Sequence, residues 1–193
     1  MASRGLDRAR LVAAAAELVD RRGPEALTLA AVAAAVGVRV PSLYHHVAGL
    51  PGLRSALRGH ALRLLHGTLS AATIGRAGRD AVAGLVGGIR DFAGAHPGLL
   101  AFTTHVAPDE ESAAAEAAEA VVALVFAVLR GYRLEGADLV HATRVLRAAV
   151  HGFVTLEAAG GFARPEEVDD TLDVLVGVLD AGLQAFAASP SRA

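Results

Sequence analysis

Polar side chains that can contact phosphates and bases lie close together near the amino terminus. They are the hydroxyl, guanidinium, phenol and imidazole groups of Thr28, Arg39, Ser42, Tyr44 and His45. In nucleic-acid complexes such groups bind phosphate oxygens, which fix the register, and base edges, which give part of the specificity. Arginine is the residue that most often contacts guanine. The types and spacing of these side chains therefore predict a surface that binds DNA.

The residues around this cluster predict two short helices joined by a glycine turn. Apolar residues with the spacing of one helical face occur at Leu29, Val32, Ala33 and Val36. Thr28 precedes this face and can cap the helix, and Gly37 can adopt the left-handed conformation that ends it. Pro41 suits the first turn of a second helix over residues 40–46, which turns Leu43 and Val47 inward. This layout is typical of a helix-turn-helix that reads DNA.

Position within the helix-turn-helix predicts a role for the remaining polar residues. The hydroxyl of Thr28 and the neighbouring N–H groups can hold a phosphate at the start of a helix. Arg39 lies in the turn before the second helix, within reach of a base or a phosphate. Arg4 precedes the first helix and can enter the adjacent minor groove as an arm. Two alternatives stay open, since Tyr44 can be a core aromatic beside incidental histidines and Arg4 a solvated charge.

The first third of the chain, from Leu6 to Leu65, resembles the TetR family of transcriptional repressors. The matching segments are DRARLVAAAAELVDRRG, PEALTLAAVAAAVGV and RVPSLYHHV. The resemblance implies an all-α fold with an amino-terminal three-helix DNA-binding domain and a carboxy-terminal helical bundle for dimerisation and ligand binding. It also implies dimerisation through the last two long helices. One departure is Leu50, which stands where the family usually has a lysine that contacts a phosphate.

A second resemblance lies between Val145 and Phe162, in the segment VLRAAVHGFVTLEAAGGF. This segment is similar to the carboxy-terminal domain of a TetR subgroup often labelled WHG, after a Trp-His-Gly motif. Val150 takes the Trp position here, before His151 and Gly152. The chain departs from the subgroup signature by this one residue.

Charge is distributed unevenly along the chain, although the net charge is only −2. Residues 1–66 carry nine arginines and four acidic residues, whereas the remainder carries nine arginines and sixteen acidic residues. A basic head on an acidic body is typical of a DNA-binding domain joined to a body that does not bind DNA. We expect a DNA-binding domain over residues 1–50, a connecting helix over 51–69, and a ligand-binding and dimerisation domain over 70–193.

Composition and missing motifs argue against several classes of protein. There is no cysteine, no i, i+4 pair among the eight histidines, and no HExxH, GxSxG or phosphate-binding loop. The amino terminus lacks the hydrophobic region of a signal peptide, and every long apolar run contains charges or glycines. We therefore expect a cytoplasmic protein that is not an enzyme, with no catalytic residue, cofactor, metal site or membrane partner.

The last helix, expected over residues 165–186 after one over 137–159, is apolar on more than one face. Its near-heptad stripe consists of Val168, Leu172, Leu175, Leu179 and Leu183. Because Val174, Val176 and Val178 cover other faces, this helix must be buried on both sides. The second side is expected to meet another copy of the chain, as in a homodimer. The alternative is a central helix within a monomer.

Aromatic and polar residues spread over the other helices of the body are candidates for a small-molecule pocket. They are Phe92, His96, Phe102, His105, Phe126, Arg144 and Phe153. An apolar set with a few donors suits a pocket between helices, although each residue alone can simply belong to the core. Arg144 can bind an acidic group of the ligand, or it can pair with Glu135 or Glu157.

Together these patterns predict a homodimeric repressor that binds a palindromic DNA operator and releases it when a small-molecule effector binds. Two alternatives belong to other classes of protein. One is a helical carrier or enzyme that uses the carboxy-terminal pocket, and the other is a nucleoid-type protein without sequence preference. The basic head and the missing catalytic motifs weigh against the carrier or enzyme.

Overall fold

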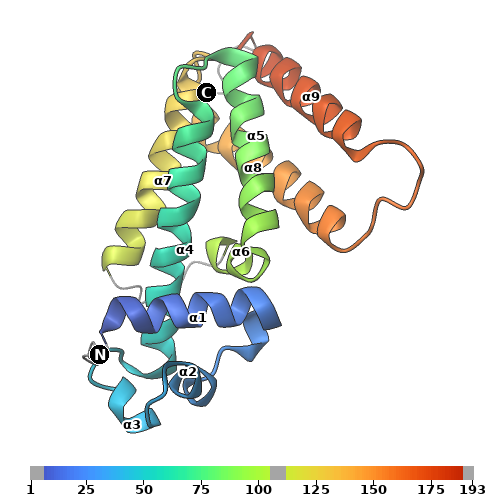
Figure 1. Cartoon of the computed structure of the whole chain (residues 1–193). Helices are drawn as coiled ribbons and strands as arrows, with labels where there is room; N and C mark the ends of the chain where they lie inside the picture. The colour runs from blue at the N-terminus through green and yellow to red at the C-terminus, as the bar shows by residue number, and fades with distance from the viewer. Residues whose placement is uncertain (1–6, 105–111, 189–193) are drawn as a thin grey trace. The chain divides into compact units, whose positions relative to one another are not determined.

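The protein is helical throughout the part that the structure, a computed structural model, describes: residues 7–104 and 112–188, which contain no strand. The helices are α1 (Arg8–Arg22), α2 (Leu29–Val36), α3 (Val40–Leu43), α4 (Gly49–Thr73), α5 (Gly78–Ala95), α6 (Pro97–Thr104), α7 (Ser112–Arg130), α8 (Gly136–Ala158) and α9 (Val168–Ala188) (Figure 1). A short 3-10 helix, Pro24–Ala26, precedes α2. The predicted all-α fold is confirmed. Arg4 and His105, two of the predicted site residues, lie outside the described residues.

The chain divides into two compact units. The first unit consists of Met1–Leu64 and Ala95–Glu119, and the second of Leu65–Gly94 and Ala120–Ala193. The first unit therefore contains α1, α2, α3 and α6, together with the first parts of α4 and α7. The functional boundaries expected at residues 50 and 70 stay predictions, because a compact unit is not itself a function.

Capping groups set the ends of the helices in the first unit. Asp7 accepts a hydrogen bond from the N–H of Arg10 at 2.7 Å, which begins α1. Helix α2 has the predicted bounds, because Thr28 caps it and Gly37, with φ of 75°, ends it. Helix α3 ends at Leu43, earlier than the predicted residue 46. From there the chain turns, with the N–H groups of residues 46 and 47 both donating to the Leu43 carbonyl.

Helix α4 continues to Thr73, beyond the end that the sequence predicted near residue 69. Residues 70–73 contain no glycine or proline, so nothing in the backbone stops the helix there. The chain leaves the helix only before Gly75, which has a φ of 72°. Its last turns belong to the second unit.

Two glycines of α5 allow a close approach to α4 in the second unit. A β-carbon on Gly84 would overlap the carbonyl oxygen of Ala72, and one on Gly88 would lie 3.0 Å from a methyl carbon of Leu69. Gly87, between them, has open space. Gly84 and Gly88 thus bring the α5 backbone against α4, because a side chain would hold the helices apart.

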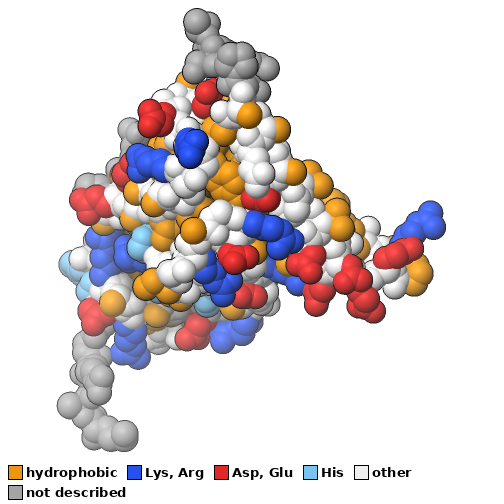
Figure 2. Space-filling model, turned by 90° about the horizontal axis from the view of Figure 1, so that it is seen from above, with side chains coloured by type: hydrophobic (Ala, Val, Ile, Leu, Met, Phe, Trp, Pro, Cys, Tyr) orange, Lys and Arg blue, Asp and Glu red, His pale blue; other side chains and the backbone are white. Residues whose placement is uncertain are grey.

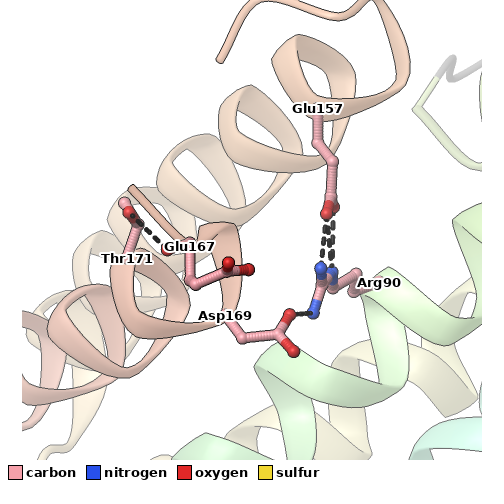
Figure 3. Close-up of polar contacts among 5 residues, drawn as sticks. All are labelled: Arg90, Glu157, Glu167, Asp169 and Thr171. Carbon is pink, nitrogen blue, oxygen red and sulfur yellow. Dashed lines mark hydrogen bonds and ion pairs between the residues drawn. The ribbon is translucent and has the colours of Figure 1, made fainter. Parts of the chain in front are cut away.

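Ion pairs and hydrogen bonds attach α8 and α9 to the rest of the second unit. Arg90 on α5 donates from Nε to both carboxylate oxygens of Glu157 on α8, at 3.0 and 2.9 Å. Its Nη1 donates to Asp169, in the first turn of α9, at 2.7 Å (Figure 3). Tyr132, which follows α7, donates its hydroxyl hydrogen to Asp180 of α9 at 2.5 Å. Helix α9 is therefore held near its start and near its middle.

Helix α9 buries only one of its apolar faces. Val176, Leu179 and Leu183 are buried, whereas Val174 and Val178 are 65% and 64% exposed. Hydrophobic side chains accordingly remain visible on the molecular surface (Figure 2). By length and composition alone, α9 is also the one helix of the described residues that is apolar enough to cross a membrane. Val174 and Val178 thus leave an apolar face of α9 accessible for an interaction.

Candidate nucleic-acid interface and ligand sites

The helix-turn-helix is assembled from local interactions around Thr28 and Gly37. The Thr28 hydroxyl accepts a hydrogen bond from the N–H of Ala31 at 3.1 Å, which satisfies one free donor at the start of α2. After Gly37, the N–H of Val38 donates to the carbonyl of Ala33 at 3.0 Å and closes the turn. These bonds form the turn between α2 and α3, and Arg39 is the residue that immediately precedes α3.

Helix α3 and the turn after it separate anchoring side chains from exposed ones. Leu43 and Val47 are 0% and 5% exposed and belong to the core, whereas Tyr44 is 60% exposed. Tyr44 is therefore not a core aromatic of the described chain. The other predicted contact residues that the structure describes are exposed as well: Thr28, Arg39, Pro41, Ser42 and His45. Local geometry thus brings five predicted residues together between positions 39 and 45 and leaves their side chains accessible.

A carboxylate of α1 joins the helix-turn-helix unit to α6. Asp20 Oδ1 accepts hydrogen bonds from the N–H groups of Gly98 and Leu99, each at 3.0 Å. Its Oδ2 lies 3.0 Å from Nδ1 of His96. A β-carbon on Gly98 would overlap the carbonyl of Val19, so the α6 backbone rests directly on the end of α1. We call Asp20, His96, Gly98 and Leu99 the Asp20 junction.

Comparisons with known proteins assign this architecture. Residues 11–46 match the family described as bacterial regulatory proteins, tetR family, and residues 82–179 match the tetracyclin repressor-like C-terminal domain. The second match covers half of the chain. This chain belongs to the TetR family.

Whole-chain relatives agree with this membership. The chain is 33% identical over 181 residues to the HTH-type transcriptional regulator YobS of Bacillus subtilis, covering 93% of each protein. It is 36% identical over 156 residues to the HTH-type regulator Rv0681 of Mycobacterium tuberculosis, covering 80% of this chain and 72% of that one. A TetR regulator from Streptomyces coelicolor superposes with a TM-score of 0.75 at 20% identity, over 95% of this chain and all of that one. The protein is thus a TetR-family transcriptional regulator, and the predicted family is confirmed.

The predicted effector set of this TetR-family protein is divided between the two units. His96 and Phe102 belong to the first unit, and Phe92, Phe126, Arg144 and Phe153 to the second. His96 is engaged in the Asp20 junction. Phe92 is buried, with 1% of its surface exposed, and Phe102 and Phe153 are each 8% exposed.

The remaining members of the set differ in their surroundings. The Phe153 ring lies 5.0 Å from that of Phe162, and Arg130 lies 5.9 Å from the Phe126 ring. Arg144 is exposed, and Glu157, one of the partners considered for it, pairs with Arg90 instead. No member of the set that the structure describes lines the groove between α8 and α9 or the cavity between α1, α4 and α7. The effector pocket in the body therefore stays a prediction.

The predicted dimer residues of α9 lie at several depths. Leu179 and Leu183 are buried within the protomer, and Val168, Leu172 and Leu175 are half-buried. A groove of about 540 Å³ runs between α8 and α9, and its lining includes Val145, Val178, Leu179, Leu183 and Phe186. Val145 is 63% exposed. Val145 and Val178 are thus the more exposed apolar side chains of the groove, and the assignment of the stripe to a dimer interface stays a prediction.

Two histidines and the polar anchors of α9 have shifted proton affinities. Burial, together with nearby Arg63, lowers the pKa of His60, and burial with Arg147 lowers that of His151. Hydrogen bonds from Arg90 to Glu157 and Asp169 raise the pKa of the guanidinium. Burial, then the hydrogen bond to Asp180, raises the pKa of the Tyr132 phenol. At neutral pH these shifts favour a charged Arg90, a protonated Tyr132 and neutral histidines.

Sequence reasoning missed two groups of residues that the structure joins. The Asp20 junction connects residues 76 to 79 positions apart, and the Arg90 contacts span 67 and 79 positions. Lone charged residues on amphipathic helices give no signal of such partners. No cluster of His, Asp or Glu within the described residues is arranged to hold a metal ion.

Proposed function

We propose that this TetR-family regulator is a repressor that binds a palindromic operator as a homodimer and releases it when a small molecule binds. The observation that carries the DNA contact is the division of α3 and its turn into a buried Leu43 and an exposed Tyr44. A recognition helix needs this combination, because one face must be fixed to the domain while the other reaches the groove. Further donors beside Tyr44 come from Arg39, Ser42 and His45. Arg4 is proposed to enter the adjacent minor groove as an arm.

A homodimer through α8 and α9 is supported by the apolar surface that one protomer leaves uncovered. Val145, Val174 and Val178 are each exposed by more than 60%, and two of them line the groove between these helices. Contiguous exposed apolar surface marks an interaction site. A two-fold axis through this surface relates two helix-turn-helix units, so the half-sites are expected about 34–36 Å apart, or a multiple of this distance.

Effector release requires a ligand that binds the DNA-free conformation more tightly than the DNA-bound one. Helix α4 can transmit the effect of a ligand to the DNA-binding residues, since it begins beside the helix-turn-helix and ends in the second unit. The Asp20 junction can transmit such an effect as well, because it fixes α6 to α1 through three polar contacts. We place the effector site in the body near Phe92, Phe126 and Phe153, and expect a largely apolar ligand with one or two polar groups.

Selection from a random duplex library, followed by sequencing, tests the proposed operator. An inverted repeat should be enriched, and affinity for it should fall steeply with salt while remaining well above that for unrelated duplex. Enrichment of a sequence without two-fold symmetry would contradict the dimer, and binding without enrichment would indicate a nucleoid-type protein.

Hydrophobic metabolites and drugs, screened by thermal shift and then for release of the selected duplex, test the effector. Compounds that stabilise the fold and also release DNA are expected. If hits never loosen the complex, or if Phe92→Ala and Phe126→Ala leave release unchanged, the body pocket is wrong. The proposed regulator acts in the cytoplasm and needs no cofactor, catalytic residue or membrane.

A further inference from the structure

A solvent-open cavity of about 470 Å³ lies in the first unit, between α1, the first half of α4 and the first turns of α7, and Arg8, Arg63 and Ala113 at its edge are exposed. Its lining residues are Arg8, Ala9 and Val12 of α1; Ser55, Ala56, Gly59, His60 and Arg63 of α4; and Ala113 and Ala114 of α7. This volume is within the range that holds small organic ligands. Among the described residues, the cavity shares none with the predicted effector set or with the groove between α8 and α9.

Small residues on all three helices leave this space open. Half of the lining residues are alanine or glycine. A β-carbon on Gly59 would lie 3.3 Å from the α-carbon of Ala114, so the α4 and α7 backbones approach each other at this wall. The same β-carbon would lie 3.3 Å from Nη1 of Arg63, which places the guanidinium beside Gly59 at the cavity wall.

Among the described residues that line the cavity, the charged groups are basic: Arg8, His60 and Arg63. Burial is the main cause of the lowered pKa of His60; Arg63 and His96 act in the same direction, and Asp20 opposes them. Arg8 makes other interactions within the chain. The argument for a ligand therefore rests on Arg63 and His60.

We propose that this cavity binds a small organic anion, with a carboxylate beside Arg63 and an apolar body against Val12 and Ala114. A guanidinium offers a carboxylate two parallel hydrogen bonds, and neutral His60 can add a further donor. Apart from Arg8 and Ser55, which make other interactions within the chain, the rest of the described lining consists of alanine, glycine and valine. A monocarboxylate with an aliphatic or aromatic body therefore fits the lining better than a compact inorganic ion.

The helices that form the walls of the cavity also position the DNA-binding surface. Helix α1 packs against α2, and α4 follows α3 directly. A ligand wedged between α1 and α4 acts on the two helices that hold the helix-turn-helix. This consequence rests on the proposed function, whereas binding of the anion does not.

Isothermal titration calorimetry on the full chain without DNA tests the site. The probes are benzoate, octanoate and naphthoate, each paired with its neutral amide, and inorganic phosphate. We expect at least one carboxylate to bind, its amide to bind about tenfold or more weakly, and phosphate to bind less well. If no carboxylate exceeds its amide, or if phosphate binds as tightly as the best carboxylate, the proposal is overturned.

Three variants locate the binding. Arg63→Gln should weaken the best carboxylate by about tenfold or more, and Ala56→Leu should abolish binding by filling the cavity. Arg54→Gln is the matched control, since Arg54 is exposed on the same helix and does not line the cavity. Circular dichroism checks that each variant is folded. Equal affinity in Arg63→Gln and in the wild type contradicts the assignment.

A second readout separates this site from the proposed function. Competition with the selected operator duplex, with and without the bound carboxylate, shows whether the occupant changes DNA affinity. A change that disappears in Arg63→Gln supports regulation through this site. Binding without any change in DNA affinity would keep the anion site and overturn its regulatory role.

Discussion

The two units differ in which side chains they pack against neighbouring helices and which they leave exposed. In the first unit, polar groups complete the packing: Asp20 satisfies two backbone N–H groups of α6 and contacts His96. In the second unit, Arg90 fixes the start of α9, but Val174 and Val178 on the same helix stay exposed. Apart from Tyr44, the large apolar side chains that are exposed among the described residues all lie in the second unit: Ile74, Val145, Leu156, Val174 and Val178.

This difference indicates what each unit is suited to bind. Exposed donors such as Tyr44 and Arg39 cost little in water and become useful beside phosphates and bases. Exposed valines gain free energy only when a surface covers them, at roughly 25 cal/mol per Å² of apolar area. We therefore expect the first unit to be complete as a protomer and the second unit to be completed by the proposed dimer.

The largest expected effect comes from a charge on the uncovered face of α9. Val178→Arg should leave the protomer folded, because the side chain is exposed there, but place an unpaired charge in the proposed dimer interface. We expect the dimer dissociation constant to rise by at least a hundredfold, roughly 3 kcal/mol. Analytical ultracentrifugation measures it.

Ala187→Arg is the control for this prediction. Ala187 is exposed and lies nine residues further along α9, which is the opposite side of the helix. It should leave the dimer intact. A wild-type chain that is monomeric at micromolar concentration, or a dimer unaffected by Val178→Arg, would contradict the role given to this face.

The next effect is a loss of stability where α6 rests on α1. Gly98→Ala should destabilise the fold by about 2–3 kcal/mol, because the added methyl overlaps the Val19 carbonyl and the helices must separate. Urea unfolding followed by circular dichroism measures this loss. Gly94→Ala, in a helical position with open space around it, should instead leave stability unchanged or raise it by up to about 1 kcal/mol. Equal effects of the two changes would mean that α6 is not in backbone contact with α1.

A smaller loss is expected when the carboxylate of the Asp20 junction is removed. Asp20→Ala leaves the N–H groups of Gly98 and Leu99 without their acceptor, which should cost about 1–2 kcal/mol. Thermal and urea unfolding measure the change. Glu17→Ala is the control, since Glu17 is an exposed acid on the same helix whose ion pair with Arg21 is 3.5 Å long. If Asp20→Ala loses no more stability than Glu17→Ala, the stabilising role of the Asp20 junction is contradicted.

The smallest effect is a pH dependence from His60 and His151. Burial lowers the pKa of both below the ordinary 6.5, so the unfolded chain binds a proton more readily than the folded one. Stability is therefore full above about pH 6.5 and falls as the pH decreases toward the lowered values. Near His60, Arg63 and His96 act in the same direction as burial, and Asp20 opposes it. The double variant His60→Gln, His151→Gln should lose less stability between about pH 7 and pH 5 than the wild type does; an unchanged slope would contradict this.

Local signals explain which parts of the fold were predictable from the sequence. Thr28 and Gly37 fixed both ends of α2, because a cap and a left-handed glycine act through neighbouring residues. The exposed position of Tyr44 also follows from spacing on one short helix. The early end of α3 was missed, since no glycine or proline marks it.

Long-range contacts explain the rest. Nothing local in the sequence marks the contact made by α6, whose first N–H groups are satisfied by Asp20, 78 residues earlier in the chain. Likewise, Glu157 was considered as a partner for Arg144 on its own helix, but it pairs with Arg90 of α5. Residue types predicted the effector set, yet the fold divides it between two units because type alone does not specify direction.

The most direct test of the central claim is operator affinity in Tyr44 variants. Fluorescence anisotropy with the selected duplex should show that Tyr44→Ala weakens binding by roughly 1–3 kcal/mol, with Tyr44→Phe in between if the hydroxyl contacts a phosphate or base. Because Tyr44 is 60% exposed, the stability of both variants should match that of the wild type. Unchanged operator affinity in a folded Tyr44→Ala protein would contradict the assignment of this surface as the DNA reader.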